Sequence, residues 1–229
     1  VKALVIQAQT DEKWLDPITN SFIRVISKQP GSTQEAIIDG LMELRKKNPS
    51  KESDIFSAIQ EAFDSPSPAV RSKVVDIWTR FSLKSDAKKS DTIADLFEIL
   101  TDDNKDVRYK TQDSLIKILN TVPKAALPEL KRALKDEDWR VVYHSIVILT
   151  EFARKYPAPS VSLAPEVISA FNSGERLKER AADCMGMLGL ANPEAMKPAV
   201  PGLIKGLESK SSEVRKASAT ALGRIGSKN

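Results

Sequence analysis

The sequence predicts an all-α solenoid, a stack of about six repeats that each contain two helices. Two observations predict it: apolar residues recur at three-to-four spacing, and one pattern returns about every 37 residues. The composition agrees with this fold. The chain has nine glycines and 6% aromatic residues, and a β-sandwich or barrel usually has more of both in its turns and strands. Paired helices of this kind bury their apolar stripes only by stacking on their neighbours.

The repeated pattern is clearest at the end of the chain, where two amphipathic segments, 199–207 and 214–226, flank a short polar turn. An apolar residue followed by a basic one marks the start of the second helix in five repeats: Val70-Arg71, Val107-Arg108, Trp139-Arg140, Leu177-Lys178 and Val214-Arg215. A degenerate copy stands at Thr33-Gln34, and subtraction gives spacings of 37, 37, 32, 38 and 37. Pro128, Pro165 and Pro201 fall in first helical turns, where proline is tolerated.

This pattern of paired helices with a placed proline, a Val-Arg pair and an Ala-Leu-Gly segment resembles the HEAT-repeat family, with the phycobilisome-lyase-like branch as the nearest match. The resemblance implies a right-handed superhelix, with first helices on its convex side and second helices on its concave side. We expect one domain, whose parts are a cap at 1–15 and repeats at about 16–48, 49–85, 86–121, 122–157, 158–191 and 192–229.

Charge and cysteine content indicate a soluble intracellular protein. The net charge of +4 is spread along the chain and forms no basic cluster of the kind that nucleic-acid-binding domains concentrate on one face. The single cysteine, Cys184, excludes an internal disulfide and favours a reducing compartment. No apolar run of 18 residues and no secretory leader pattern occur, so we expect a cytoplasmic protein that does not enter a membrane.

The predicted second helices carry a repeated arrangement of charge. Aspartate recurs six residues after the start of the second helix at Asp39, Asp76, Asp113 and Asp183, which indicates a solvated charge ladder or an acidic column that receives a basic partner. The basic residue of each Val-Arg pair is expected to bind acids in the turn before it. The family resemblance implies a structural Asp/Arg ladder between adjacent repeats, for which the candidates are Asp64, Arg71, Asp102, Arg108, Asp136, Arg140, Lys178 and Arg215.

The fourth repeat departs from this pattern, because its second helix, 139–152, is apolar on nearly every side. One interpretation is a helix that is buried all round, and the other is a hydrophobic groove for a partner segment. The second hypothesis gives the candidate partner-binding residues Tyr109, Ile116, Val141, Ile148, Leu149 and Met187. It predicts that Leu149→Asp abolishes partner binding and preserves helical content.

No residue pattern indicates catalysis. His144 is the only histidine, which excludes a histidine-based triad and a multi-histidine metal site, and no glycine-rich phosphate loop occurs. We therefore predict no catalytic, cofactor-binding or metal-binding residue. The predicted function is a non-catalytic scaffold that binds a protein or peptide on the concave face. The alternative is nucleic-acid binding along basic edges, as in DNA-glycosylase-like solenoids. Scattered tryptophans disfavour that alternative, and a turn without aromatic and basic residues disfavours a tubulin-binding array.

Overall fold

The computed structural model describes residues 1–84 and 89–227, and every regular element in these ranges is a helix. The all-α paired-helix prediction is therefore confirmed. Side chains of 89–91 are not described, and the predicted repeat boundary at 85 and 86 lies outside the described residues. Contacts between Cα atoms divide the chain into two compact units, Val1–Arg80 and Phe81–Asn229.

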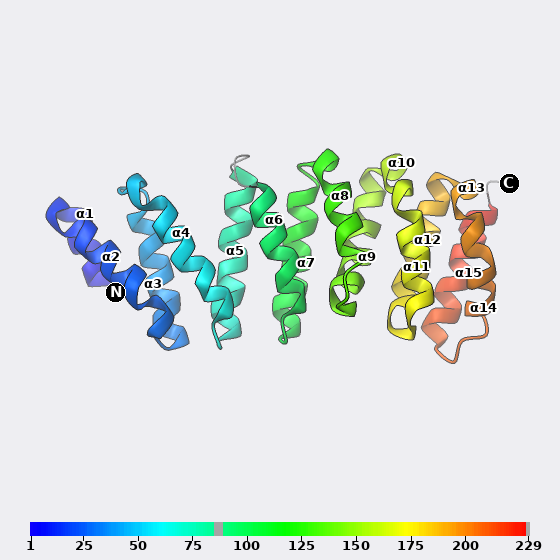
Figure 1. Ribbon diagram of the computed structural model, residues 1–229, viewed down its shortest axis with the longest axis horizontal. Helices are drawn as coiled ribbons and strands as arrows, with labels where there is room; N and C mark the ends of the chain where they lie inside the picture. The colour runs from blue at the N-terminus through cyan, green and yellow to red at the C-terminus, as the bar shows by residue number, and fades with distance from the viewer. Residues whose placement is uncertain (85–88, 228–229) are drawn as a thin grey trace. The chain divides into compact units, whose positions relative to one another are not determined.

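The first unit consists of α-helices joined by short 3-10 turns, and its last helix continues past Arg80. Its helices are α1 (Lys2–Thr10), α2 (Leu15–Val25), α3 (Gly31–Leu44), α4 (Glu52–Gln60) and α5 (Pro68–Lys84). Helix α1 packs against α2 and α3, with Val5 and Ala8 buried. Helices α2 and α4 are the first helices of their pairs, and α3 and α5 are the second helices (Figure 1).

The second unit contains four further helix pairs, which follow one another in chain order (Figure 1). Its first helices are α6 (Lys89–Glu98), α8 (Pro123–Ala133), α11 (Ala164–Ser173) and α14 (Val200–Gly206), with the one-turn helices α10 (Pro157–Ser160) and α13 (Pro193–Met196) before the last two. Its second helices are α7 (Lys105–Leu119), α9 (Trp139–Lys155), α12 (Glu175–Ala191) and α15 (Ser212–Gly226). Each of these second helices packs on the next one in the series.

The starts of the second helices set the register of the repeat. Side chains of Asn104, Asp138 and Ser211 accept main-chain N–H groups and cap α7, α9 and α15. We number the third residue of each second helix as position 0, which gives Thr33, Val70, Val107, Val141, Leu177 and Val214, with spacings of 37, 37, 34, 36 and 37 by subtraction. The predicted start of the fourth repeat at Trp139-Arg140 is therefore wrong by two residues, and Val141 is its position 0.

This register explains the core. Positions 0, 4, 8 and 11 of α9 are Val141, Ser145, Leu149 and Phe152, and all four are buried. The same positions of α7 (Val107, Thr111, Leu115 and Ile118) are also buried. Helix α9 thus has the ordinary buried stripe of a second helix, and its solvent-facing residues lie at the positions between.

Candidate partner-binding surface

The structure corrects half of the hydrophobic groove that the sequence predicts. Val141, Ile148 and Leu149 lie in the core, and the last two have no exposed surface. The sequence interpretation placed them outside because it began the repeat at Trp139, two residues early. Burial of an apolar helix, the other interpretation of this segment, is what the structure shows for these three residues.

The remaining candidates lie at the surface of neighbouring second helices. Tyr109 on α7 is 49% exposed, while Ile116 on α7 and Met187 on α12 are half-buried. On α9, the accessible apolar residues are Trp139, Tyr143 and Val147, which are four residues apart and so share one helix face. We call the set Tyr109, Ile116, Trp139, Tyr143, Val147 and Met187 the exposed stripe.

A buried histidine holds the two tyrosines of the exposed stripe in place. The His144 ring meets Tyr109 and Tyr143 edge to face, with ring centroids 5.5 and 5.2 Å away. Its Nδ1 donates a 2.8 Å hydrogen bond to Gln112 Oε1, and both side chains are buried. Burial, and secondly the charge of Arg108, lowers the pKa of His144 to about 4, so the ring is neutral at pH 7.

Two arginines of α12 bind the aromatic residues of α9. Arg180 Nε donates to Tyr143 Oη at 3.2 Å, and the guanidinium carbon of Arg176 lies 4.8 Å from the centre of the Trp139 ring. The tyrosine hydrogen bond is the main cause that raises the pKa of Arg180. Carboxylates of Glu179 and Asp183 also approach Arg180, at 3.6 and 3.8 Å. The surface thus combines aromatic rings with anchored cations, an arrangement suited to binding another macromolecule.

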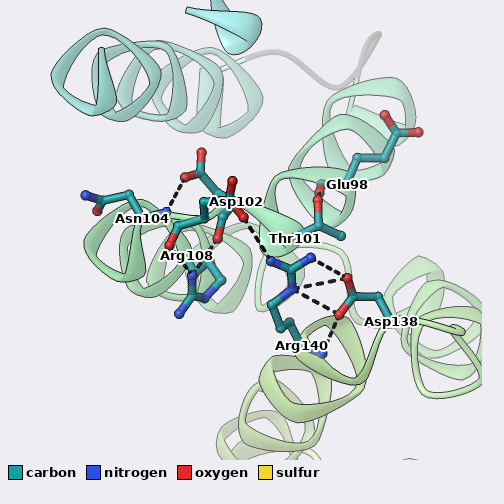
Figure 2. Close-up of polar contacts among 8 residues, drawn as sticks. Glu98, Thr101, Asp102, Asn104, Arg108, Asp138 and Arg140 are labelled. Carbon is teal, nitrogen blue, oxygen red and sulfur yellow. Dashed lines mark hydrogen bonds and ion pairs between the residues drawn. The ribbon is translucent and has the colours of Figure 1, made fainter. Parts of the chain in front are cut away.

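The turns before the second helices hold the predicted Asp/Arg ladder in a different form. Arg108 Nη1 donates to the main-chain oxygens of Asp102 and Asp103, and Figure 2 shows it beside the turn that Asn104 ends. Arg71 makes the same contact with Ser65 O, and Arg215 with Ser209 O. Each arginine donates to carbonyl groups five or six residues earlier in the chain, so these arginines close their own turns.

The turns themselves share a hydrogen bond. In four of these turns, a side-chain oxygen accepts a hydrogen bond from the main-chain N–H two residues later. The accepting residues are Ser65, Asp102, Asp136 and Ser209. In each of them position 0 of the second helix follows five residues later. Lys178 pairs with Glu175, and Asp64 lies exposed at the end of its 3-10 turn.

Arg140 is the ladder residue that joins adjacent repeats. It binds Asp138 with Nε and Nη2, the latter at 2.7 Å (Figure 2). Its Nη1 reaches Asp103 of the preceding repeat at 3.3 Å. Hydrogen bonding from Arg140 lowers the pKa of Asp138. Arg140 is among the ladder residues that the sequence predicts, whereas Asp103, whose backbone oxygen also binds Arg108, is not.

Other chemistry is sparse in the part of the chain that the structure describes. Cys184 is fully buried, and burial raises the pKa of its thiol to about 12. Within residues 1–84 and 89–227, no three histidine, cysteine or acidic side chains are grouped so that they could hold a metal ion. None of the helices described there has the length and apolar character needed to cross a bilayer.

The surface predicted from the sequence does not include Trp139, Tyr143 and Val147 of the exposed stripe. It also does not include Arg176 and Arg180. The available signal was the N-cap: an aspartate at 138 directly before an apolar run indicates where the helix begins. That start would have put Val147 at position 6, where α7 and α12 carry Asp113 and Asp183. No spacing along the chain would have indicated that Arg176 stacks on Trp139.

Comparisons with known proteins agree with this architecture. A family model described as HEAT repeats matches residues 57–147, and one described as HEAT-like repeat matches residues 175–225. Neither description specifies the phycobilisome-lyase-like branch, which stays a prediction. No curated protein matches the sequence.

Solved structures with similar folds are 15% identical to this chain, which shows the fold alone. The designed armadillo repeat protein YIII(Dq)4CqI has a TM-score of 0.50, with 90% of this chain and 98% of that chain covered. A chain from a structure of Kap95p binding to RanGDP has a TM-score of 0.63, with 96% and 31% covered. A chain from a Kap95:Nup1 complex has a TM-score of 0.54, with 90% and 30% covered. This chain therefore spans about a third of the length of the chains it matches in the two Kap95 structures.

Proposed function

The chain belongs to the HEAT-repeat family, and from that premise we propose that it is a non-catalytic scaffold or adaptor that binds a partner protein or peptide on the exposed stripe. In the geometry that the family resemblance implies, second helices line the concave side, so the proposed site is the concave face of repeats three to five. The buried Cys184 thiol is consistent with the cytoplasm as the proposed setting.

One observation carries the proposal: aromatic residues occupy position 2 in α7 and α9, two second helices that pack on each other. Position 2 is Tyr109 in α7 and Tyr143 in α9, whereas α5, α12 and α15 have Ser72, Glu179 and Lys216 there. Tyrosine, tryptophan and arginine are the residues that most often dominate binding energy at interfaces. Because His144 and Arg180 already fix the rings, a partner would lose little side-chain entropy by binding them.

Two further observations support a protein or peptide partner. The Kap95 structures with a similar fold are described as complexes with RanGDP and with Nup1. In addition, arginines that the nucleic-acid alternative would use are occupied, because Arg108 and Arg215 donate to carbonyl oxygens of their own turns. Phosphate binding would have to compete with those bonds.

The test is capture of a partner from a lysate of the native source, identified by mass spectrometry, with two tryptophan variants compared. Trp139→Ala removes an exposed ring from the stripe, and Trp14→Ala removes an equally exposed ring from the first unit; the exposures are 43% and 40%. We expect Trp139→Ala combined with Tyr109→Ala to lose at least about tenfold in affinity for the captured partner, as expected for two hot-spot residues. Trp14→Ala is expected to bind like the unmodified chain.

Equal binding by all three proteins would reject the exposed stripe as the site. Titration with DNA and RNA over a range of salt separates the alternative function. Nucleic-acid binding that falls steeply with salt, together with no captured protein, would replace the scaffold proposal. Binding to the stripe is expected to vary little with salt, because its central residues are uncharged.

A further inference from the structure

The contact between Lys73 and Asp39 shows how charge links adjacent second helices. Nζ of Lys73, at position 3 of α5, lies 2.6 Å from Oδ2 of Asp39, at position 6 of α3. Position 3 carries a nitrogen-containing side chain in four successive second helices, as Lys73, Lys110, His144 and Arg180. Position 6 of α7 is again an aspartate, Asp113. The pair of Lys73 with Asp39 is therefore a template for the group that would neutralise Asp113.

Helix α9 does not supply this group to α7. Its position 3 is His144, which is buried and bonds with Nδ1 to Gln112, at position 5 of α7. Burial lowers the pKa of the His144 ring, so the ring is uncharged at pH 7. In addition, a histidine side chain is shorter than a lysine side chain. Among the described residues of α9, none forms an ion pair with Asp113.

Asp113 lies at the surface beside Tyr109. In residues 1–84 and 89–227, no hydrogen bond or ion pair reaches the Asp113 carboxylate, and the lysines before and after it on α7, Lys110 and Lys117, do not pair with it. Tyr109 is four residues before Asp113, on the same side of α7, and is 49% exposed. Asp106, three residues before Tyr109, is exposed and has no ion pair in this part of the chain either. The Tyr109 ring thus lies between two unpaired carboxylates.

The arginines on the α12 side of the exposed stripe already have partners. The guanidinium of Arg176 lies over the ring of Trp139, and Arg180 binds Tyr143 and two acidic residues of its own helix. The exposed stripe therefore presents unpaired negative charge beside Tyr109 and neutralised positive charge along α12. A cation that lies against an aromatic ring and next to a carboxylate is attracted by both, so a basic group complements this surface.

We propose that the partner segment carries a lysine or arginine whose charge pairs with Asp113 and lies against the Tyr109 ring, as Lys73 pairs with Asp39 in the first unit. An apolar residue next to this lysine or arginine would cover Ile116, which is half-buried and three residues after Asp113. The proposal rests on the proposed function, because it takes the exposed stripe as the site where the partner binds.

A phage-displayed library of random dodecapeptides provides probes for this site without knowledge of the natural partner. Peptides are selected on the unmodified chain, and the tightest binders are synthesised with a fluorophore and titrated by fluorescence anisotropy. We expect the selected peptides to contain a lysine or arginine next to an apolar residue more often than the unselected library does. A single ion pair at the border of the exposed stripe is expected to make their binding only slightly dependent on salt.

Variants of Asp113 test whether the carboxylate itself is recognised. Asp113→Asn is expected to weaken binding of the selected peptides about fivefold, as for an accessible ion pair. Asp113→Glu keeps the charge and is expected to bind like the unmodified chain. Glu208→Gln removes the same charge from an exposed carboxylate in the last repeat, and it is also expected to bind like the unmodified chain. Circular dichroism checks that every variant is folded.

A charge exchange shows whether the two side chains meet. Asp113→Lys is expected to weaken binding about tenfold or more, and replacement of the basic residue of the peptide by glutamate is expected to restore binding to this variant. Restoration is not expected if Asp113 acts only through the net charge of the chain.

The outcomes separate this proposal from the proposed function. Peptides that lose affinity when Trp139 and Tyr109 are replaced by alanine, but bind Asp113→Asn as they bind the unmodified chain, would overturn the basic partner and leave the exposed stripe as the site. Selection of peptides rich in aspartate and glutamate would overturn it as well. A library that gives no binder, or binders that none of these substitutions affects, would reject both proposals.

Discussion

Helices α7 and α9 begin alike and then use their arginines differently. Asn104 and Asp138 cap them, and position 0 is valine in both. Position 1 is Arg108 in α7, where it binds turn carbonyls, but in α9 it is the buried Val142. The arginine of α9 lies before position 0, at Arg140, and bridges to the preceding repeat. The comparison teaches that the cap residue, and not the apolar-basic pair, fixes the register.

The largest predicted effect comes from a substitution in α9 at a core position that the sequence-based register places at the surface. Leu149→Asp puts a carboxylate where no solvent reaches, and we expect it to destabilise the second unit by about 4 kcal/mol or more. Val147→Asp, at the half-buried position 6 where α7 has Asp113, is expected to change stability by about 1 kcal/mol or less. Urea unfolding followed by circular dichroism measures both.

The sequence-based register makes the opposite forecast for this pair. It expects Leu149→Asp to fold normally and to lose only partner binding. Equal stabilities of the two variants would therefore favour that register over the one in the structure.

A pH effect of intermediate size sharpens the comparison, because α9 has His144 at position 3 where α7 has Lys110. Burial lowers the pKa of His144 to about 4 in the folded chain, while an unfolded histidine titrates near 6.5. The unfolded chain thus binds more protons between these values, and stability falls as pH drops from 6.5 toward 4. We expect His144 to account for about 2 to 3 kcal/mol of this loss.

Unfolding free energies at several pH values, compared with those of His144→Gln, isolate the contribution. The difference in unfolding free energy between the unmodified chain and His144→Gln should become smaller as the pH falls from 6.5 toward 4. If this difference in unfolding free energy is constant from pH 7 to pH 4.5, the pKa of His144 is the same in the folded and unfolded chains.

The smallest predicted effects are the losses of stability when Arg108 or Arg140 is replaced by alanine. Arg108→Ala removes two hydrogen bonds to carbonyl groups and should cost about 1 to 2 kcal/mol. Arg140→Ala removes ion pairs near the surface and should cost about 0.5 kcal/mol. Thermal unfolding of both variants at low and high salt checks the difference, since only the Arg140 contribution should shrink markedly with salt. The reverse order would mean that the bridge to Asp103, and not the turn, holds these repeats together.

Much of the fold follows from patterns along the chain. Apolar periodicity, placed prolines and the recurring Val-Arg pair suffice to identify paired helices, because the apolar stripe of each helix is formed by residues three or four apart within that helix. The same periodicity predicts that Tyr109, Ile116 and Met187 lie outside the core, and the structure leaves all three accessible. Val141, Ile148 and Leu149 were misplaced because a shift of two residues turns a helix by about 200°, which exchanges its buried and exposed sides.

The remaining features depend on distances between helices. The contact of Arg176 with Trp139 and that of Arg180 with Tyr143 join residues 37 apart in sequence, so they exist only after α9 and α12 have packed. The same is true of the close approach of Ile225 to Gly189: glycines in a helix are visible in the sequence, but the neighbouring side chain that needs them is not.

The fixed turn length has a consequence for how the chain tolerates added residues. The five-residue distance from Ser65, Asp102, Asp136 and Ser209 to the following valine is constant, whereas repeat spacings differ by up to three residues. The differences in repeat length therefore lie outside this turn. An epitope tag or a spectroscopic probe is best introduced between a second helix and the following first helix, for example at Thr121. This position lies outside the turns that Arg71, Arg108 and Arg215 close.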